Sequence, residues 1–266
     1  MRLKTMENSK RLIIIMSAAL SLALVAAGCD KKETASQESN AAESSKASSP
    51  ATPIDPTTVA SISGVVKFDG VPPKPTKIDM SQDPACTSAD ANMTQTVVAD
   101  GGNLGNVFVY VKNGLADRTF DPPKDPVTID QNGCRYIPHV LGVMAGQPIK
   151  IVNSDNTTHN IHPSPTINRE WNESQAPKSA PLDKSFPREE IMMQVKCNQH
   201  PWMKMFLNVS KTPFFAVTDK DGKYEIKGLP PGEYTIAARQ EKLGEQTMKV
   251  TVAAKANGTG NFTFKQ

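Results

Sequence analysis

From about residue 60 onward, the chain alternates short apolar or β-branched runs with turns rich in Gly, Pro and Asp. The runs with strand character are "SISGVVKF", "NVFVYVKNG", "VTID", "QPIKIVNSD", "EIMMQVKC", "FFAVTDKDGKYEIKG" and "GEYTIAARQ". Strands at this spacing, with turn signals between them, are typical of a β-sandwich or barrel. Beyond the N-terminal segment no stretch keeps a helical apolar period, so we predict an all-β protein.

The N-terminal residues have a different pattern. Four basic side chains precede an apolar run over residues 12–27, which is shorter than the ~20 residues of a membrane-spanning helix and ends in small residues, as signal peptides do. The run ends in "LVAAGC", which resembles a bacterial lipobox. The resemblance implies that residues 1–28 are removed and Cys29 is lipidated, anchoring the protein in the bacterial cell envelope, facing the periplasm or cell surface. An ordinary cleaved signal peptide with an incidental cysteine is the alternative.

Residues 29–57 are rich in Ser, Ala, Glu, Lys and Pro and contain almost no large apolar side chains. Such a segment cannot offset the entropy lost on ordering, so we interpret it as a disordered tether between the membrane and the folded part. Residues 1–28 hold four basic residues and one acidic residue, which leaves 26 of each sign in the remainder. A balanced chain gives no support for nucleic-acid binding.

Two segments near the ends of the folded part belong to one pattern. "ISGVVKFDGVPPKP" comes first, and "VTDKDGKYEIKGLPPGEYTIAAR" follows much later, with Asp221-Gly222 and Pro231-Gly232 as tight turns between alternating strands. Together they resemble carboxypeptidase regulatory-like, or transthyretin-like, β-sandwiches. The resemblance implies a small structural or docking module formed by residues 58–125 and 213–266, with residues 126–212 inserted as a second domain.

Four cysteines follow the apolar run: Cys29, Cys86, Cys134 and Cys197. Free thiols tend to oxidise outside the cytoplasm. If Cys29 carries lipid, three thiols remain, and Cys86 and Cys134 both lie in polar, turn-like contexts, so we expect a disulfide between them. Cys197 is then the odd thiol, which a bound metal would both protect and use.

Two motifs in the central segment occur in a fixed order. "YIPHVLGVMAGQPIKIVNSDNTTHNIH", residues 136–162, resembles the first half of a cupredoxin, and "CNQHPWM", residues 197–203, resembles the ligand loop of amicyanin-like cupredoxins. The resemblance implies a Greek-key cupredoxin-like sandwich with one type 1 copper. Its implied ligands are His159, Cys197, His200 and an axial Met203, with Asn160 hydrogen-bonded across to the cysteine loop. Such a set suits an ion that cycles between Cu(I) and Cu(II).

Strand parity gives an independent expectation for these side chains. Counting back by twos from Cys197 reaches an apolar face: Val195, Met193 and Ile191. We therefore expect Cys197 to point inward. In an extended segment His159 shares a face with Ile161 while His162 points the other way, which favours His159 as the ligand. We interpret His139 and His162 as satisfied side chains outside the site.

Two methionines follow His200. Met203 lies three residues after it, as in amicyanin-like loops, and Met205 lies five residues after it, as in plastocyanin-like loops. Pro201 and Trp202 match the shorter loop, so the resemblance assigns Met203 as the axial ligand and Met205 to the returning strand. Trp202 is interpreted as a shield over the site.

The resemblance implies a membrane-tethered copper protein that carries single electrons to an unidentified redox partner protein and is not an enzyme. An exposed edge of His200 would be the electron port. Other functions would use the same residues: His159, His162, Cys197 and His200 form a plausible four-ligand zinc set. Copper delivery or storage would use the copper ligands, and a thiol hydrolase would use Cys197 with a histidine as its base. A binding module whose copper half is vestigial would use none of them.

Overall fold

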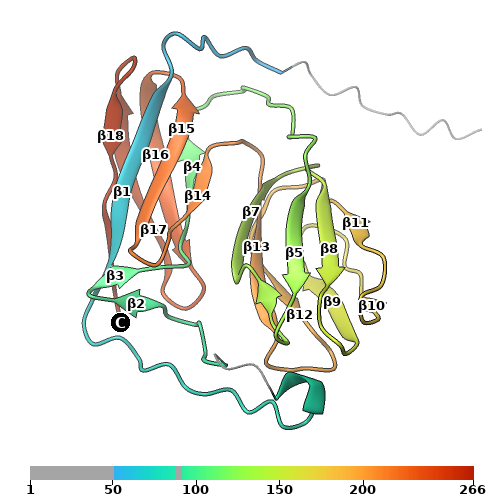
Figure 1. The fold of residues 1–266 in the computed structure, drawn as a ribbon. Coiled ribbons are helices and arrows are strands. Elements are labelled where there is room, and N and C mark those ends of the chain that lie inside the picture. Colours follow the sequence, from blue (N-terminus) through green and yellow to red (C-terminus); the bar gives the residue numbers. More distant parts are fainter. Residues whose placement is uncertain (1–50, 88–91) are drawn as a thin grey trace, which may run out of the picture. The chain divides into compact units, whose positions relative to one another are not determined.

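The computed structural model describes residues 51–87 and 92–266 (Figure 1). This part of the chain consists of β-strands joined by turns and loops, with one short 3-10 helix, η1 (Pro84–Cys86). The predicted all-β class is confirmed. Within the described ranges, no helix is long and apolar enough to cross a membrane. The predicted signal peptide and the lipidation site Cys29 lie outside the described residues.

Two sheets form a first sandwich. One contains β1 (Ala60–Asp69), β2 (Ala99–Asp100), β3 (Asn103–Leu104), β15 (Lys223–Leu229), β18 (Asn257–Thr259) and β19 (Phe262–Lys265). The other contains β4 (Phe108–Asn113), β14 (Phe215–Val217), β16 (Gly232–Gln240) and β17 (Gly244–Val252). Strand β1 pairs antiparallel with β15 and parallel with β18 and β19, so segments from both ends of the folded part close one sheet.

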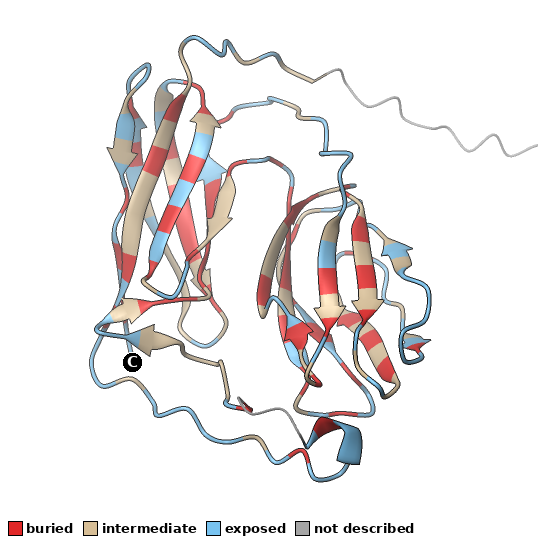
Figure 2. Ribbon diagram, viewed as in Figure 1, coloured by how far each residue is buried: buried red, intermediate tan, exposed pale blue. Residues whose placement is uncertain are grey.

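The inner faces of these two sheets share one core, which includes Ile62 of β1, Val109 of β4 and Ile236 of β16. Strand β15 shows how the sequence pattern produces this core. From Lys223 to Ile226 its residues alternate between exposed and buried, and Figure 2 shows them as alternating bands. Alternation with a period of two is what a sheet with one buried face requires.

Two further sheets form a second sandwich. One has the order β10 (Glu173–Gln175), β9 (His159–Ser164), β12 (Glu190–Lys196), β13 (Lys204–Ser210) and β7 (Val140–Met144). The other has the order β11 (Leu182–Lys184), β8 (Ile149–Asn153), β5 (Val127–Gln131) and β6 (Tyr136–Ile137). Apolar side chains from both sheets fill a separate core that also contains Cys197.

Strand β12 departs from the simple parity count. Met193 and Val195 are buried with Cys197, as expected, but Ile191 is only partly buried and packs with Met192 against a different cluster that includes Phe108. The pairing of β12 with β13 shifts register between Glu190 and Met193, and Met192 has a φ of 62°. A β-bulge adds one residue to the strand and reverses the face of everything before it. The expectation for Ile191 was therefore wrong.

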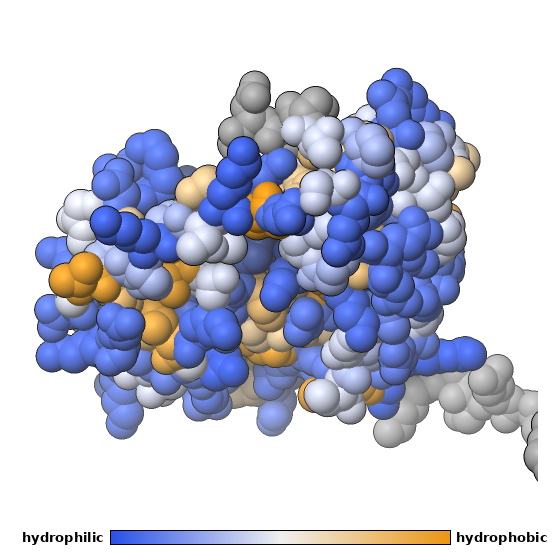
Figure 3. Space-filling view, turned by 90° about the horizontal axis from the view of Figure 1, so that it is seen from below, coloured by the Kyte–Doolittle hydropathy of each residue, from blue (hydrophilic) through white to orange (hydrophobic). Residues whose placement is uncertain are grey.

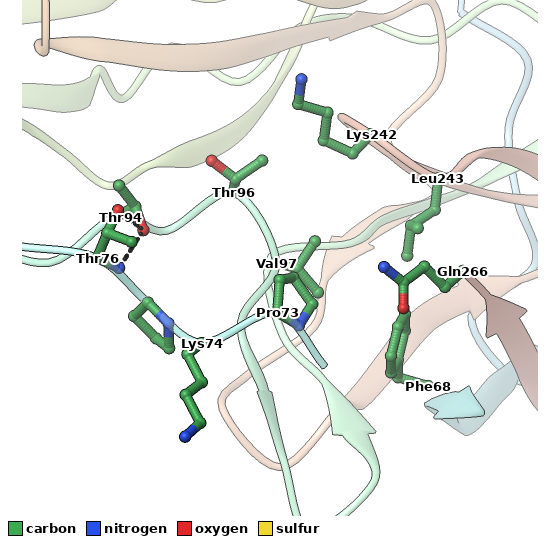
Figure 4. Close-up of a pocket in the computed structure, with 11 residues that line it drawn as sticks. Phe68, Pro73, Lys74, Thr76, Thr94, Thr96, Val97, Lys242, Leu243 and Gln266 are labelled. Carbon is green, nitrogen blue, oxygen red and sulfur yellow. Dashed lines mark hydrogen bonds between the residues drawn. The ribbon is translucent and has the colours of Figure 1, made fainter. Parts of the chain in front are cut away.

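Residues 72–87 and 92–98, which we call the arm, leave the first sandwich and return to it. Figure 3 views the face that carries this arm, where hydrophilic side chains surround smaller apolar areas. Thr94 N–H donates to the Thr76 carbonyl (2.9 Å) and Thr76 N–H donates to Thr94 Oγ1 (3.0 Å), the contact drawn in Figure 4. Met80 and Cys86, near the tip of the arm, are buried in the core of the second sandwich. A segment that the sequence pattern assigned to the first domain therefore contributes to the core of the second.

The folded part also begins earlier than the sequence pattern indicated. Thr52 N–H donates to the Thr119 carbonyl (2.8 Å), and Ile54 packs against the core of the first sandwich. These residues had been assigned to the tether, whose earlier part lies outside the described residues. A single apolar side chain and a few backbone hydrogen bonds are enough to order the last residues of such a segment.

One buried carboxylate fixes the entry into β12. Glu190 is 5% exposed and accepts hydrogen bonds from Thr166 N–H, Thr166 Oγ1, Ile167 N–H, Asn168 N–H and Asn168 Nδ2. Burial by itself would raise the pKa of Glu190, but the hydrogen bonds from Thr166 and Asn168 outweigh it and hold the pKa below its ordinary value of 4.5. The charged form is the one that the fold stabilises.

We predict that Glu190→Gln lowers the free energy of unfolding at pH 7 by about 2 kcal/mol, since an amide cannot accept all of these bonds. Because the folded pKa is depressed, the contribution is complete above the unfolded pKa and is lost as the pH falls through the folded pKa. Urea unfolding of wild type and variant should therefore give a stability difference that narrows as the pH falls below 4.5. Glu189→Gln is the control, because Glu189 is a half-buried neighbour whose carboxylate lies 3.8 Å from Lys211 Nζ near the surface. An equal difference at all pH values would contradict the assignment.

Candidate metal centre

Three side chains from neighbouring strands converge at one end of the second sandwich. His159 begins β9, Cys197 directly follows β12, and His200 lies in the loop between β12 and β13. These strands are adjacent and antiparallel, so the start of β9 and the end of β12 meet at the same edge. One ligand atom from each residue lies within 4.8 Å of the other two. The structure therefore brings together His159, Cys197 and His200.

The donor atoms face one another inside the core. The Nδ1 atoms of His159 and His200 are 2.8 Å apart, and Cys197 Sγ lies 3.8 Å from His200 Nδ1. The exposed fractions of His159, Cys197 and His200 are 0%, 3% and 4%. Water is therefore excluded from all three donors.

Hydrogen bonds favour the ionised form of the cysteine. Burial by itself would raise the pKa of the Cys197 thiol, but hydrogen bonds from His159 and from the backbone N–H groups of Asn160, His200 and Gln199 lower the pKa to about 6. The Asn160 N–H lies 3.3 Å from Cys197 Sγ. The thiolate, rather than the thiol, is the form that binds metals. The loop is thus arranged to present a metal-binding sulfur near neutral pH.

A carboxylate lies behind each imidazole. His159 Nε2 is 2.9 Å from Asp155 Oδ2, and His200 Nε2 is 3.0 Å from Asp83 Oδ2. Asp155 also accepts from the N–H groups of Gly133 (2.7 Å) and Cys134 (2.8 Å). A carboxylate on the far nitrogen fixes the tautomer and orientation of a ligating imidazole and makes it a stronger donor. Both Nδ1 atoms are thus left to face the space between the three donors.

Sequence reasoning missed both carboxylates. Asp155 had a usable signal, because it lies four residues before His159 in the quoted "NSDNTTHN" segment. Asp83 had none, because 117 positions separate it from His200. Only the folding of the arm onto the second sandwich brings that pair together.

The donor set fits a small transition-metal ion. Burial by itself would lower the pKa of His159, but hydrogen bonds to Asp155 and Cys197 raise it above its ordinary value. Two imidazole nitrogens that bind one ion at roughly 2.0–2.1 Å lie about 3.3 Å apart, only slightly farther than the Nδ1 atoms here. Two nitrogens and one thiolate are donors that copper and zinc accept. His159, Cys197 and His200 would therefore hold such an ion.

The two methionines occupy different positions. Met203 N–H donates to the His200 carbonyl (2.9 Å) and its own carbonyl accepts from Cys197 N–H (3.2 Å), which closes the ligand loop. Its side chain is 1% exposed and lies in the same core as Cys197. Met205 lies in β13 opposite Val195 and is fully buried. Its role as a residue of the returning strand agrees with its place, while axial ligation by Met203 stays a prediction.

Two other histidines lie outside the centre. His162 contacts Asn198 Oδ1 through Nδ1 (2.9 Å) and Glu170 Oε1 through Nε2 (2.6 Å). His139 Nε2 lies 2.9 Å from Glu241 Oε2, in the turn between β16 and β17. Since both nitrogens of His162 have partners away from the centre, the four-ligand zinc set would require a rearrangement.

Asn160 reaches the cysteine by a different group than expected. Its backbone N–H points at Cys197 Sγ, while its side-chain Nδ2 donates to Asn172 Oδ1 (3.3 Å). Its carbonyl accepts from the hydroxyl of Tyr136. Any residue with an N–H at this position can make the contact to sulfur, so the amide side chain secures the strand rather than the cysteine loop.

A disulfide and an aromatic ring cover the outer side of His200. Cys86 and Cys134 are joined, and Cys197 remains a free buried thiol. Cys86 Sγ lies 3.9 Å from His200 Nε2, and the Trp202 ring centroid lies 5.1 Å from that of His200. The expected exposed edge of His200 was therefore wrong, because the arm folds over it. Trp202 does cover the site, as a shield would.

The comparisons with known proteins concern separate parts of the chain. The carboxypeptidase regulatory-like domain family matches residues 206–265, which begin in β13 and cover the C-terminal part of the first sandwich. No curated protein sequence matches the chain. These residues include the Asp-Gly and Pro-Gly turns on which the resemblance to that family was based.

Several solved structures are similar to one part of the chain. A Cu-containing nitrite reductase from Thermus scotoductus is 18% identical, with 37% of this chain and 25% of that chain covered and a TM-score of 0.31. A purple cupredoxin from Nitrosopumilus maritimus is 20% identical, with 32% and 99% covered and a TM-score of 0.28. A mutant of amicyanin is 14% identical, with 38% and 98% covered and a TM-score of 0.30. The chain thus spans a quarter of the nitrite reductase and nearly all of the two cupredoxins.

We predict that Asp155→Asn weakens Zn(II) binding by roughly 10–100-fold, because the carboxylate that holds the His159 ring and the Gly133–Cys134 turn is lost. Competition with a chromophoric chelator measures the affinity. Asp183→Asn, which changes an exposed carboxylate of β11, should bind Zn(II) as wild type does. Equal affinities for the two variants would show that Asp155 does not orient the ligand.

Proposed function

We propose that the chain is an electron carrier with one type 1 copper, held by His159, Cys197 and His200 with Met203 as a weak axial ligand. The observation that carries this proposal is the convergence of two imidazole nitrogens and a low-pKa sulfur in a water-free core. When bound, copper would supply a one-electron couple between Cu(II) and Cu(I). The protein supplies the rest: strands that hold the donors, and carboxylates that fix the imidazoles.

The burial of the centre distinguishes among the candidate functions. A copper delivery protein must let a partner reach the metal, and a thiol hydrolase must let a substrate reach sulfur, yet Cys197 is 3% exposed. An electron needs no open channel, because it tunnels over a few ångströms of packed protein. A rigid, closed ligand set also changes little between oxidation states. These properties favour an electron carrier over both alternatives, and no catalytic role is assigned.

The proposed place of action is the bacterial cell envelope, with Cys29 as the lipid-bearing residue and a redox protein as partner. The disulfide between Cys86 and Cys134 supports an oxidising compartment, because such bonds rarely persist in the cytosol. The first sandwich would then be a structural or docking module beside the copper-binding one. Residues 29–266 carry equal numbers of acidic and basic side chains, which gives no support for nucleic-acid binding.

We predict that Cu(II) added to the purified metal-free protein gives an intense visible thiolate-to-copper band at one copper per chain, and that the band disappears on reduction. Cys197→Ser and His159→Ala should each abolish it. His162→Ala is the matched control and should keep it, because both nitrogens of that ring face away from the centre. A colourless protein that binds Zn(II) tightly and loses this affinity in His162→Ala would instead support the structural zinc site.

We predict that Met203→Leu retains copper but raises the reduction potential and alters the visible spectrum, since an axial thioether is a weak, long ligand. Met205→Leu should leave both unchanged and cost about 1 kcal/mol of stability or less, because it is a volume-conserving change in a packed strand. Voltammetry, visible spectra and urea unfolding of both variants measure these effects. The reverse pattern would make Met205 the axial ligand.

A further inference from the structure

The tip of the arm lies directly on the metal centre. We call residues 79–87, which include η1, the strap (Figure 1, the short coil drawn in teal). Met80 and Cys86 of the strap are 3% and 1% exposed and belong to the core that contains Cys197. The remainder of the strap is mostly polar and exposed. The strap is therefore attached to the second sandwich at two buried points.

Asp83 lies between these two points and contacts the centre. Its Oδ2 lies 3.0 Å from His200 Nε2 and accepts from Thr157 Oγ1 (2.7 Å). Thr157 belongs to the loop that leads to His159. One carboxylate oxygen therefore joins the strap to both segments that carry the proposed histidine ligands.

The capping of η1 does not account for this arrangement. Asp83 is the N-cap of η1, and its Oδ1 accepts from Ala85 N–H (2.9 Å), which by itself satisfies the cap. The second oxygen is free for other partners, and it is the one directed at His200. An asparagine or serine would cap the helix equally well, but neither carries the negative charge.

The disulfide keeps the carboxylate in place. Cys86 is three residues after Asp83, its N–H donates to the Asp83 carbonyl (2.9 Å), and its sulfur is bonded to Cys134. The N–H of Cys134 in turn donates to Asp155, the carboxylate behind His159. This covalent crosslink therefore supports both carboxylates, one on each side of the bond.

We propose that Asp83 is a positioning residue of the metal centre: it holds the His200 imidazole in the tautomer and orientation in which Nδ1 faces the metal, and its charge favours the more highly charged metal ion. The proposal rests on the proposed function in one respect, that His200 is a metal ligand. With its Nε2–H directed at the carboxylate, the ring can neither rotate nor offer Nδ1–H to the metal. A negative charge behind the ligand stabilises Cu(II) more than Cu(I), so it lowers the reduction potential.

Three variants of the full chain separate charge from geometry. Asp83→Asn can keep an oxygen on His200 and Thr157 but removes the charge, whereas Asp83→Ala removes both. Asp79→Asn is the matched control, because Asp79 is an exposed carboxylate of the same strap whose side chain accepts from Ser81 N–H (2.9 Å). Mass mapping of the non-reduced proteins is used to check that each variant keeps the Cys86–Cys134 bond.

Zn(II) affinity and the reactivity of the metal-free protein are the primary measurements. Asp83→Ala should bind Zn(II) about 10–100-fold more weakly than wild type. Asp83→Asn should lose less Zn(II) affinity than Asp83→Ala does. In the metal-free protein, Cys197 of Asp83→Ala should react faster with iodoacetamide, because the cover over His200 is loosened. In the copper-loaded protein, Asp83→Asn should have a higher reduction potential than both wild type and Asp79→Asn.

The outcomes distinguish this inference from the proposed function. If Asp83→Ala binds Zn(II) as tightly as Asp79→Asn, and Asp83→Asn leaves the copper potential unchanged, the positioning role is wrong even if wild type is an electron carrier. If wild type gives no thiolate-to-copper band, the electron-carrier proposal fails, while the Zn(II) affinities still decide whether Asp83 positions His200. An affinity loss in Asp83→Ala with unchanged potential in Asp83→Asn would contradict the charge effect.

Discussion

The structure depends on keeping one thiolate and two imidazoles inside an apolar core. Removing such groups from water is costly unless hydrogen bonds and opposite charges compensate for the loss. Here backbone N–H groups surround Cys197, and Asp155 and Asp83 stand behind the two rings. The compensating groups come from the β8–β9 loop, the start of β9, the β12–β13 loop and the strap, so the polar centre specifies how these segments are arranged at this end of the second sandwich.

The need to surround the metal centre with polar partners connects the two sandwiches, although the sequence pattern divides them into separate domains. The first sandwich contributes the arm, and the arm contributes Met80, Asp83 and Cys86 to the surroundings of the centre. The two sandwiches also touch at the bulge of β12, where Ile191 and Met192 pack with Phe108 and its neighbours. The inserted segment therefore has its own core but not its own complete centre.

For the proposed electron carrier, the cover over His200 also changes where an electron would pass between the centre and the surface. The imidazole edge lies beneath Asp83 and the disulfide, while Trp202 stays half-buried, with its ring against His200 and its indole N–H bonded to the Cys134 carbonyl (3.2 Å). Trp202, Arg135 and Lys204 line a cleft of about 310 Å³. The Trp202 ring, which packs against the His200 ring, borders this cleft.

The sequence by itself determined the all-β class, the strand faces that bury Cys197 and His159, and the candidate donors, because period-two patterning and ligand spacing are local properties. It also favoured Cys86 and Cys134 as a pair, because both lie in polar, turn-like contexts and Cys29 was set aside as the lipidation site. It could not reveal the bulge that moves Ile191 from the core of Cys197 to the cluster around Phe108, because the bulge depends on pairing with β13. Nor could it reveal Asp83 on His200, because 117 positions separate them and no periodicity reports such a distance. Tertiary structure decided that the ligand expected at the surface is enclosed, because covering it needs a segment from a distant part of the chain.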